Sequence, residues 1–295
     1  MTVNNFISSI WAAKILASLK KAHVYTQSGV VNTDYQGDIS GQGAVVKING
    51  IGSITVRPYV KNVAIEKPET LTDAQTSLLI DQADYFNFEV DDIDAAQQTP
   101  KVMTEAMAQA AHDTSDVSDL YAAGLMVAGA AAGNKIGTTA AAIVPSATAG
   151  DTMYDYIVDM STVLSESGCP KNGRWIVVPP WVTGELAKDD RFTNMAASGS
   201  PEALRNGFVS RIAGFDVLES LNVPEVDGTA DEAGKTDSVI IAGQPMGFSY
   251  AEQINKIVPY KPEDSFSDAI KGLHVYGAKV VRPACLATLT CRKVA

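Results

Sequence analysis

The sequence predicts an α+β fold, because helical and strand-like patterns occupy separate stretches of its 295 residues. Three observations carry this prediction. Apolar side chains recur at helical spacing over residues 4–21, they alternate with polar ones between Val45 and Val90, and a second helical pattern runs from Thr99 to Gly133. Hydrophobic residues make up 46% of the chain and charged residues 19%, which is typical of a folded protein.

Residues 1–44 are expected to form an N-terminal arm. Their apolar positions at helical spacing are Phe6, Ile7, Ile10, Trp11, Ile15 and Leu19. The segment that follows is rich in glycine and polar residues and offers no apolar stripe to cover this helix. We therefore expect the face formed by Phe6, Ile10 and Trp11 to pack on a neighbouring subunit. No positive charge precedes the apolar part and no small-residue cleavage site follows it, so a signal peptide is not predicted.

Residues 45–94 are expected to contain extended hairpins. Val45–Gly50 and Ile54–Arg57 read as a first pair of strands around a turn at Asn49–Gly50. An isolated two-stranded ribbon is only marginally stable in water, so the rest of the chain or another copy must cover it. Candidate subunit-interface residues in this region are Val45, Ile48, Ile54, Val56 and Tyr59.

A second hairpin is expected further along this region. Leu78–Ile80 and Tyr85–Val90 flank a polar turn at Asp81–Asp84. The alternation places Phe86 and Phe88 on one face of the second strand.

Residues 95–144 are expected to form a long spine helix. Thr99 supplies a capping hydroxyl and Pro100 suits the first helical position. If the helix continues to Gly133, its roughly 35 residues span about 50 Å. The polar stretch Asp113–Asp116 is a place where it could bend.

Residues 145–243 are expected to form a mixed α/β unit, and residues 244–295 to supply returning strands. The expected helices are 153–168, 181–187 and 201–206, and the expected strands are 174–178, 208–212, 215–218, 239–242, 273–281 and 285–290. The acidic segment Glu225–Asp237 reads as an exposed loop.

Catalytic, cofactor-binding and metal sites are not predicted. His23, His112 and His274 are scattered and none stands at a metal-binding spacing from another ligand. The three cysteines, Cys169, Cys285 and Cys291, fit free thiols in a large chain. The longest apolar stretch beyond the N-terminal segment is about fourteen residues, short of the roughly 20 that cross a bilayer, so no membrane partner is expected.

The charge balance argues against a protein that binds nucleic acid tightly through a basic face. The chain carries 23 Lys and Arg against 34 Asp and Glu, a formal net charge of -11. An acidic container can still hold DNA, because mobile cations neutralise the phosphates.

Four segments resemble the major capsid proteins of tailed double-stranded-DNA bacteriophages with the Hong Kong 97 type capsid fold. They are Ile176–Pro180, Gly207–Val217, Gly243–Gln253 and Tyr276–Pro283, in this order. The resemblance covers nearly the whole chain. It implies an N-arm (1–44), an extended β-hairpin loop and adjoining peripheral-domain strands (45–94), a spine helix of the peripheral domain (95–144), an apical domain (145–243) and returning peripheral strands (244–295).

The same resemblance implies what the protein does. The expected function is self-assembly into pentamers and hexamers that form the icosahedral head enclosing double-stranded DNA, in the virion and, during assembly, in the host cytoplasm. A scaffolding protein and a portal are the implied partners, with a decoration protein as an optional third. An encapsulin-type nanocompartment shell shares the fold and remains an alternative, and a soluble α/β enzyme is the alternative from another class.

Overall fold

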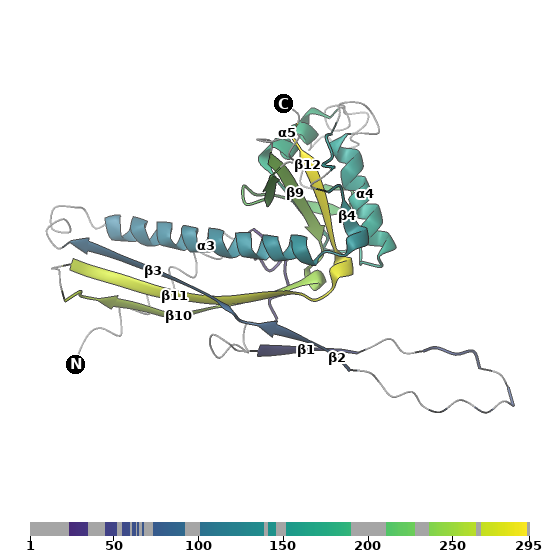
Figure 1. The fold of residues 1–295 in the computed structure, drawn as a ribbon, viewed down its shortest axis with the longest axis horizontal. Coiled ribbons are helices and arrows are strands. Elements are labelled where there is room, and N and C mark those ends of the chain that lie inside the picture. Colours follow the sequence, from purple (N-terminus) through teal and green to yellow (C-terminus); the bar gives the residue numbers. More distant parts are fainter. Residues whose placement is uncertain are drawn as a thin grey trace.

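The fold is seen in a computed structural model. It describes residues 24–34, 45–51, 55–59, 61–62, 64, 67, 73–91, 101–138, 141–145, 152–189, 211–227, 236–263 and 267–293. Two units share this chain: a long helix lying along a three-stranded sheet, and a mixed unit that stands at one end of the helix (Figure 1). The predicted α+β class is confirmed. In the described residues, no helix is long and apolar enough to cross a membrane.

The first unit is built on helix α3 (Lys101–Gly129), as the sequence predicts. It covers one face of a sheet with the order β10 (Phe248–Tyr260), β11 (Ser267–Val280), β3 (Gln82–Asp91), all antiparallel. In the half of this unit that lies farther from the mixed unit, apolar side chains hold the helix on the sheet. Met107, Ala111, Ile257 and Ile270 are buried there, and Phe86 and Phe88 pack against them. The helix therefore rests on the face that the period-two pattern assigned to Phe86 and Phe88.

The polar stretch Asp113–Asp116 does not interrupt α3. Thr114 Oγ1 and Ser115 Oγ donate to the carbonyls of Ala110 and Ala111, four residues earlier, so these hydroxyls find partners inside the helix. Ser115 is buried and is accommodated because its hydroxyl is bonded.

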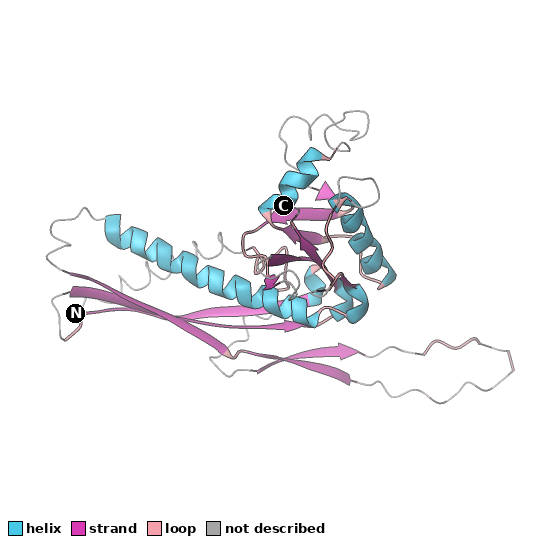
Figure 2. Cartoon of the chain, turned by 45° about the horizontal axis from the view of Figure 1, so that its top comes forward, coloured by secondary structure: helices cyan, strands magenta, loops and turns pink. Residues whose placement is uncertain are grey.

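The second unit is a mixed sheet with helices packed on it (Figure 2). Within the described chain its strand order is β4 (Lys135–Ile136), β12 (Leu286–Arg292), β9 (Thr236–Gly243), β5 (Trp175–Val178), β7 (Phe215–Glu219) and β6 (Arg211–Ile212), with β8 (Glu225–Asp227) paired to β9. Helices α4 (Met153–Glu166) and α5 (Pro180–Lys188) complete it. Short 3-10 turns lie at Ala132–Asn134, Pro245–Gly247 and Pro283–Cys285.

The core of this unit follows directly from its apolar strands. All four residues of β5 and all seven of β12 are buried. Helix α4 begins with a capping box, in which Thr152 and Asp155 satisfy each other's backbone amides. Its buried side chains Met153, Ile157, Met160 and Leu164 pack against Cys285, Ala287, Leu289 and Cys291.

Strand β12 corrects the division of the chain drawn from the sequence. Residues 244–295 were expected to return together to the sheet under α3, and β10 and β11 do so. Strand β12 instead lies between β9 and β4 in the mixed sheet. The reason is composition: its run of buried small and aliphatic residues suits a strand covered on both faces.

The predicted turn at Asn49–Gly50 is wrong. Strand β1 (Val45–Ile51) runs through both residues and pairs antiparallel with β2 (Asp73–Leu79), with Asn49 opposite Gln75 and Gly50 opposite Ala74. The hairpin therefore closes over a much longer loop, and residues 55–57, expected as a strand, are not in one. An Asn-Gly pair is a strong turn signal, but here the strand partner lies further along the chain.

The second predicted hairpin is also wrong. Strands β2 and β3 follow each other closely, yet β2 pairs with β1 and β3 pairs with β11. Residues 82–84, expected in a turn, are the start of β3. The polar residues that suggested a turn have partners on other elements: the hydroxyl of Tyr276 in β11 donates to Asp84, and the hydroxyl of Tyr121 in α3 donates to Asp81.

The end of the expected arm is anchored in the molecule. Asp119 of α3 accepts from the backbone N–H of Val24 at 2.9 Å and from Thr26 Oγ1 at 3.1 Å. Tyr25, Val30 and Val31 are buried in the core between the two units. Burial, and secondarily the charge of Asp119, raise the pKa of Tyr25, so its hydroxyl stays protonated. The assignment of all residues 1–44 to an uncovered arm is therefore wrong for 24–34.

The acidic segment Glu225–Asp237 is not simply an exposed loop. Strand β8 pairs with β9, and Asp237 is fully buried. Its carboxylate accepts from Nε and Nη2 of Arg292, the latter at 2.9 Å, so β9 and β12 share a buried bidentate ion pair.

Candidate assembly surfaces

The structure places some of the predicted interface residues and leaves others untested. Phe6, Ile10, Trp11 and Ile54 lie outside the described residues. Val45 begins β1, with its backbone opposite Leu79. Ile48 is buried within its own chain, whereas Val56 and Tyr59 are exposed. Val56 and Tyr59 are therefore available for a contact with another molecule, and Ile48 has a different role.

Ile48 belongs to the base of the extended loop. Together with Val46, Leu78, Ile80, Ala251 and Val275 it forms a small buried cluster that joins β1 and β2 to the three-stranded sheet. The expectation that this hairpin lacks cover from its own chain is wrong at its base. Alternation puts these side chains on one face, and the sheet of the same chain receives them.

Gly277 makes this junction possible. A Cβ on Gly277 would lie 2.4 Å from the carbonyl oxygen of Leu79 and 2.8 Å from Cα of Ile80. The backbone of β11 therefore touches the backbone at the end of β2, an approach that only glycine permits. The base of the loop is thus fixed to the body of the subunit.

The far end of the loop, residues 55–62, carries apolar and basic side chains; we call it the loop tip. Val56 is 92% exposed and Tyr59 76% exposed. The described part of the loop tip contains Arg57 and Lys61 and no acidic residue. At Asn62 the backbone adopts φ 67°, the left-handed conformation that asparagine tolerates better than most residues. Asn62 stands with Lys61 in a turn.

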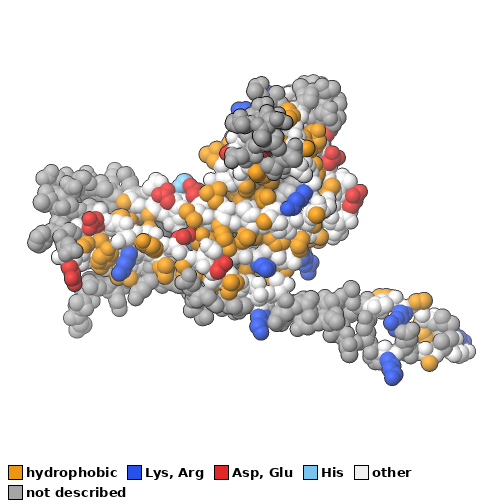
Figure 3. Space-filling model, viewed as in Figure 1, with side chains coloured by type: hydrophobic (Ala, Val, Ile, Leu, Met, Phe, Trp, Pro, Cys, Tyr) orange, Lys and Arg blue, Asp and Glu red, His pale blue; other side chains and the backbone are white. Residues whose placement is uncertain are grey.

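A second exposed apolar surface lies on α3 beside the mixed unit. Val117 and Leu120 of the helix are 47% and 51% exposed, and Leu221, in the connection after β7, is 86% exposed. Figure 3 shows apolar side chains next to acidic ones along this helix. We call Asp113, Asp116, Val117, Leu120 and Leu221 the α3 patch.

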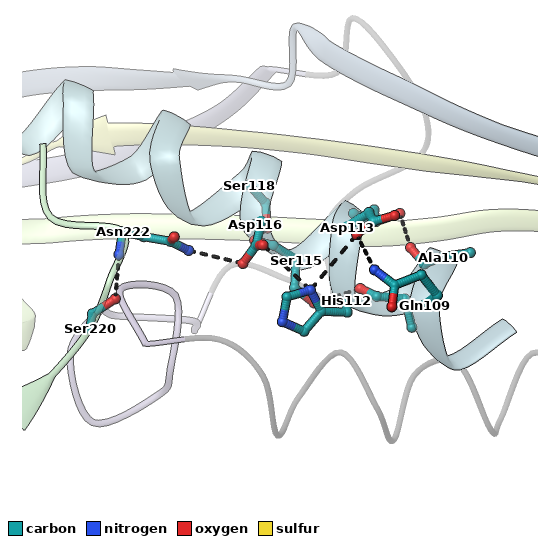
Figure 4. Close-up of polar contacts among 11 residues, drawn as sticks. Gln109, Ala110, His112, Asp113, Ser115, Asp116, Ser118, Ser220 and Asn222 are labelled. Carbon is teal, nitrogen blue, oxygen red and sulfur yellow. Dashed lines mark hydrogen bonds and ion pairs between the residues drawn. The ribbon is translucent and has the colours of Figure 1, made fainter. Parts of the chain in front are cut away.

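Polar contacts hold the acidic part of the α3 patch in place (Figure 4). Asn222 Nδ2 donates to Asp116 Oδ1 at 3.0 Å, and the Asn222 backbone N–H donates to Ser220 Oγ. His112 Nδ1 lies 3.4 Å from the other carboxylate oxygen of Asp116. Leu221 is therefore tethered to α3 by its neighbour Asn222. Asp113 keeps 66% of its side chain exposed.

The α3 patch has no clear sign in the sequence, because Val117 and Leu120 fit the apolar spacing of the helix and such spacing does not show that a side chain is exposed. Their neighbours Ser118 and Asp119 are the buried ones. At 100° per residue, Leu120 points about 100° away from Asp119 and Val117 about 160° away, so both fall outside the stripe that faces the sheet. The buried polar residues Ser118 and Asp119 are the reason why the sequence pattern does not show which side of the helix is exposed. The exposed Leu221 had no sequence signal that we can identify.

The described residues hold no cluster of His, Cys, Asp and Glu suited to a metal ion. All three cysteines are buried free thiols. Burial, and secondarily the nearby Cys285 thiol, raise the pKa of Cys169 to about 11, and burial raises that of Cys291 to about 12.

The native protein is therefore expected to resist thiol reagents. At pH 8 a thiol of pKa about 11 is ionised in roughly one molecule per thousand, and only the thiolate attacks. Burial disfavours the anion, so the pKa rises and reactivity begins at higher pH than in the unfolded chain. Titration of native and urea-unfolded protein with a thiol-reactive dye at pH 8 checks this. Fast labelling of the native protein would contradict it.

The subunit is elongated, and its projecting loop exposes apolar side chains (Figure 1). These features are typical of a structural protein that assembles with other copies. The chain belongs to the phage capsid protein family, whose model matches residues 75–289. It is a major capsid protein that forms the head shell, as the sequence resemblance indicates, and its place is the capsid of the virion.

Solved structures agree with this assignment. A structure from Mycobacterium phage Che8 is 29% identical, covers 90% of each chain and has a TM-score of 0.69. The capsid structure of the Cyanophage P-SCSP1u shares the fold at 14% identity, covering 87% of this chain and 85% of that one, with a TM-score of 0.68. The virus-like particle from Pyrococcus furiosus shares it at 12% identity, covering 96% and 99%, with a TM-score of 0.55. No curated protein matches the sequence.

Proposed function

We propose that this chain assembles through its extended loop into pentamers and hexamers of an icosahedral head that encloses double-stranded DNA. The observation that carries the proposal is the exposure of Val56 and Tyr59 at the loop tip. The base of the same hairpin is held to the rest of the chain by the buried cluster around Ile48. Exposed apolar side chains at such a place favour a contact with another copy. A repeated contact between unlike surfaces closes into rings when its rotation allows.

The roles proposed for the other regions of the chain are taken from the phage capsid protein family. Within the proposed shell, residues 145–243 and β12 converge at the centre of each ring as the apical unit, and α3 with its sheet forms the periphery. The N-terminal residues, with Phe6, Ile10 and Trp11, reach another subunit. A scaffolding protein and a portal are the proposed partners, with a decoration protein as an optional third, and assembly takes place in the host cytoplasm. The role is structural, without catalysis.

A nanocompartment shell is the second candidate function. The virus-like particle from Pyrococcus furiosus shares the fold over 96% of this chain, so the fold by itself does not distinguish a phage head from another kind of shell. Electron microscopy of particles purified from phage-infected cells separates the two. DNA-filled shells with a portal vertex are the expected result. Small uniform shells that contain a protein cargo would favour the nanocompartment over the phage head. A protein that stays monomeric would contradict both functions.

Deletion of residues 1–21 is expected to leave the subunit folded and to prevent stable shells. Folding should survive because the described core begins at Val24, which is held by Asp119. The measurement pairs circular dichroism of the subunit with particle yield by sucrose-gradient sedimentation. Failure to fold would place the deleted segment in the core, and normal shells would remove its role in assembly.

A further inference from the structure

We propose that Asn134 and Asn222 are positioning residues that fix the angle between the two units of the subunit, and that this angle sets the curvature of the shell. The inference rests on the proposed function, in which the mixed unit lies at the centre of each ring and α3 with its sheet forms the periphery. It adds the residues that hold these two parts at one angle.

The chain passes between the two units in connections that meet beside the end of α3. In the described chain these connections are residues 130–134, 244–247 and 281–285. Backbone hydrogen bonds join them to one another: the N–H of Ala131 donates to the carbonyl of Pro283, and the N–H of Gln244 donates to the carbonyl of Cys285. The connections therefore form one bonded bundle between the units (Figure 1).

Asn134 ties this bundle to the mixed unit. Its side chain is only 4% exposed, and its Nδ2 donates to the carbonyls of Ala284 at 3.0 Å and Leu286 at 2.9 Å. Its Oδ1 accepts from Oγ of Ser167, one residue beyond α4, at 2.8 Å. A buried amide that uses both its donor and its acceptor in this way holds its partners in one arrangement. Asn134 therefore joins the end of α3, the start of β12 and the end of α4.

Asn222 forms a second link, well away from the first. It follows β7 of the mixed unit, and its Nδ2 donates to Oδ1 of Asp116 in α3 at 3.0 Å (Figure 4). Asp116 precedes Gly129, the last residue of α3, by about 20 Å along the helix axis. The mixed unit is therefore held to α3 both beyond the end of the helix and in its middle.

Apolar packing lies between the two units but does not define their angle by itself. Hydrophobic contact is non-directional, whereas a hydrogen bond depends on both distance and angle. Across a span of about 20 Å, a shift of about 1 Å at one link with the other held turns the mixed unit by about 3°. The buried side chains between the units include Ala122, Ala123 and Met126 of α3 with Trp175, Val177 and Ile241 of the mixed sheet.

A distance measurement within the unassembled subunit tests the two links. Spin labels are placed on Tyr85→Cys in β3 and Lys171→Cys beyond α4, both exposed positions, and double electron–electron resonance gives the distribution of distances between them. The native cysteines are at most 5% exposed and take up little label. Asn222→Ala and Ser167→Ala are each expected to broaden this distribution at least about twofold, because each frees one link while the apolar contact remains.

Two matched controls remove similar groups that do not join the units. Gln109→Ala deletes an amide that donates to Asp113 of the same helix, and Thr162→Ala deletes a hydroxyl that donates to the carbonyl of Val158 in its own helix. Both controls should keep the original distance distribution. The double variant Asn222→Asp/Asp116→Asn should restore it, because the hydrogen bond is rebuilt with donor and acceptor exchanged.

Electron microscopy of assembled particles tests the consequence for the shell. With Asn222→Ala or Ser167→Ala, the share of particles that keep the original diameter is expected to fall at least about fivefold, because an error in angle repeats around each ring. The controls and the exchanged pair should give the original diameter. Circular dichroism of each subunit checks that it is folded.

The possible results separate this inference from the proposed function. An unchanged distance distribution in both Asn222→Ala and Ser167→Ala, or equal broadening in the controls, overturns the assignment of the two links. Broader distributions with particles of the original diameter overturn the connection to curvature. Absence of particles from the unaltered chain overturns the proposed function and with it the claim on curvature, while the distances still decide whether the two asparagines fix the angle.

Discussion

Replacing Asp237 with alanine is expected to lower the free energy of unfolding by about 3–5 kcal/mol. The change leaves Arg292 buried between β9 and β12 without the carboxylate that now accepts two of its N–H groups. Removing one partner of a buried ion pair costs more than the pair contributes, because that carboxylate no longer offsets the desolvation of the guanidinium. Urea denaturation of the unassembled subunit, followed by tryptophan fluorescence, measures the loss.

The control for this variant is Asp216→Ala. Asp216 also pairs with an arginine, Arg211, at 2.9 Å, but the two side chains are 53% and 66% exposed. An exposed pair contributes about 0–1 kcal/mol, since water replaces the partner. Similar losses for the two variants would show that burial does not set the cost and would contradict the account of Asp237.

Replacing Gly277 with alanine is expected to displace the extended loop and to stop assembly. The new methyl group would meet the carbonyl oxygen of Leu79 at 2.4 Å and Cα of Ile80 at 2.8 Å. Both are backbone atoms, so a side-chain rotation cannot relieve the contact, and β1 and β2 must move away from β11. Such overpacking costs about 1–3 kcal/mol, and the loop tip moves with its base. Particle yield measures the effect.

Gly184→Ala is the matched control for Gly277→Ala. Gly184 lies in α5 with no atom within 4 Å of an added Cβ, and alanine is favoured over glycine in a helix by about 1 kcal/mol. This variant should assemble normally and be slightly more stable. If Gly277→Ala also gave the original particle yield, the close approach at the loop base would not position the loop.

The sequence predicted elements whose pattern is local. The long helix, α4, β5 and the face of β3 follow from the spacing of their apolar residues. Family resemblance supplied the function. Strand pairing could not be predicted in the same way, because a strand's pattern does not name its partner: β1 and β2 both alternate, yet they meet across a long loop.

The candidate surfaces were half predictable. Val56 and Tyr59 were found because apolar residues alternate in a segment without cover, and the structure leaves them exposed. The exposure of Val117 and Leu120 was not predicted, because the buried Ser118 and Asp119 depart from the usual rule that polar residues face water. Asp119 is buried because it binds the chain at Val24, a partner 95 residues away that no local pattern reveals.

The position of β12 also governs how the subunit can fold. This strand sits between β4 and β9, so the middle of the mixed sheet is completed by residues that lie beyond the whole β10–β11 ribbon in sequence. Pairings over such separations close late and slowly. Until β12 docks, β9 keeps an open, apolar edge on which another chain could add a strand. Nascent or truncated chains that end before Leu286 are thus the forms most exposed to aggregation, and a stable mixed unit cannot be excised as residues 145–243 alone.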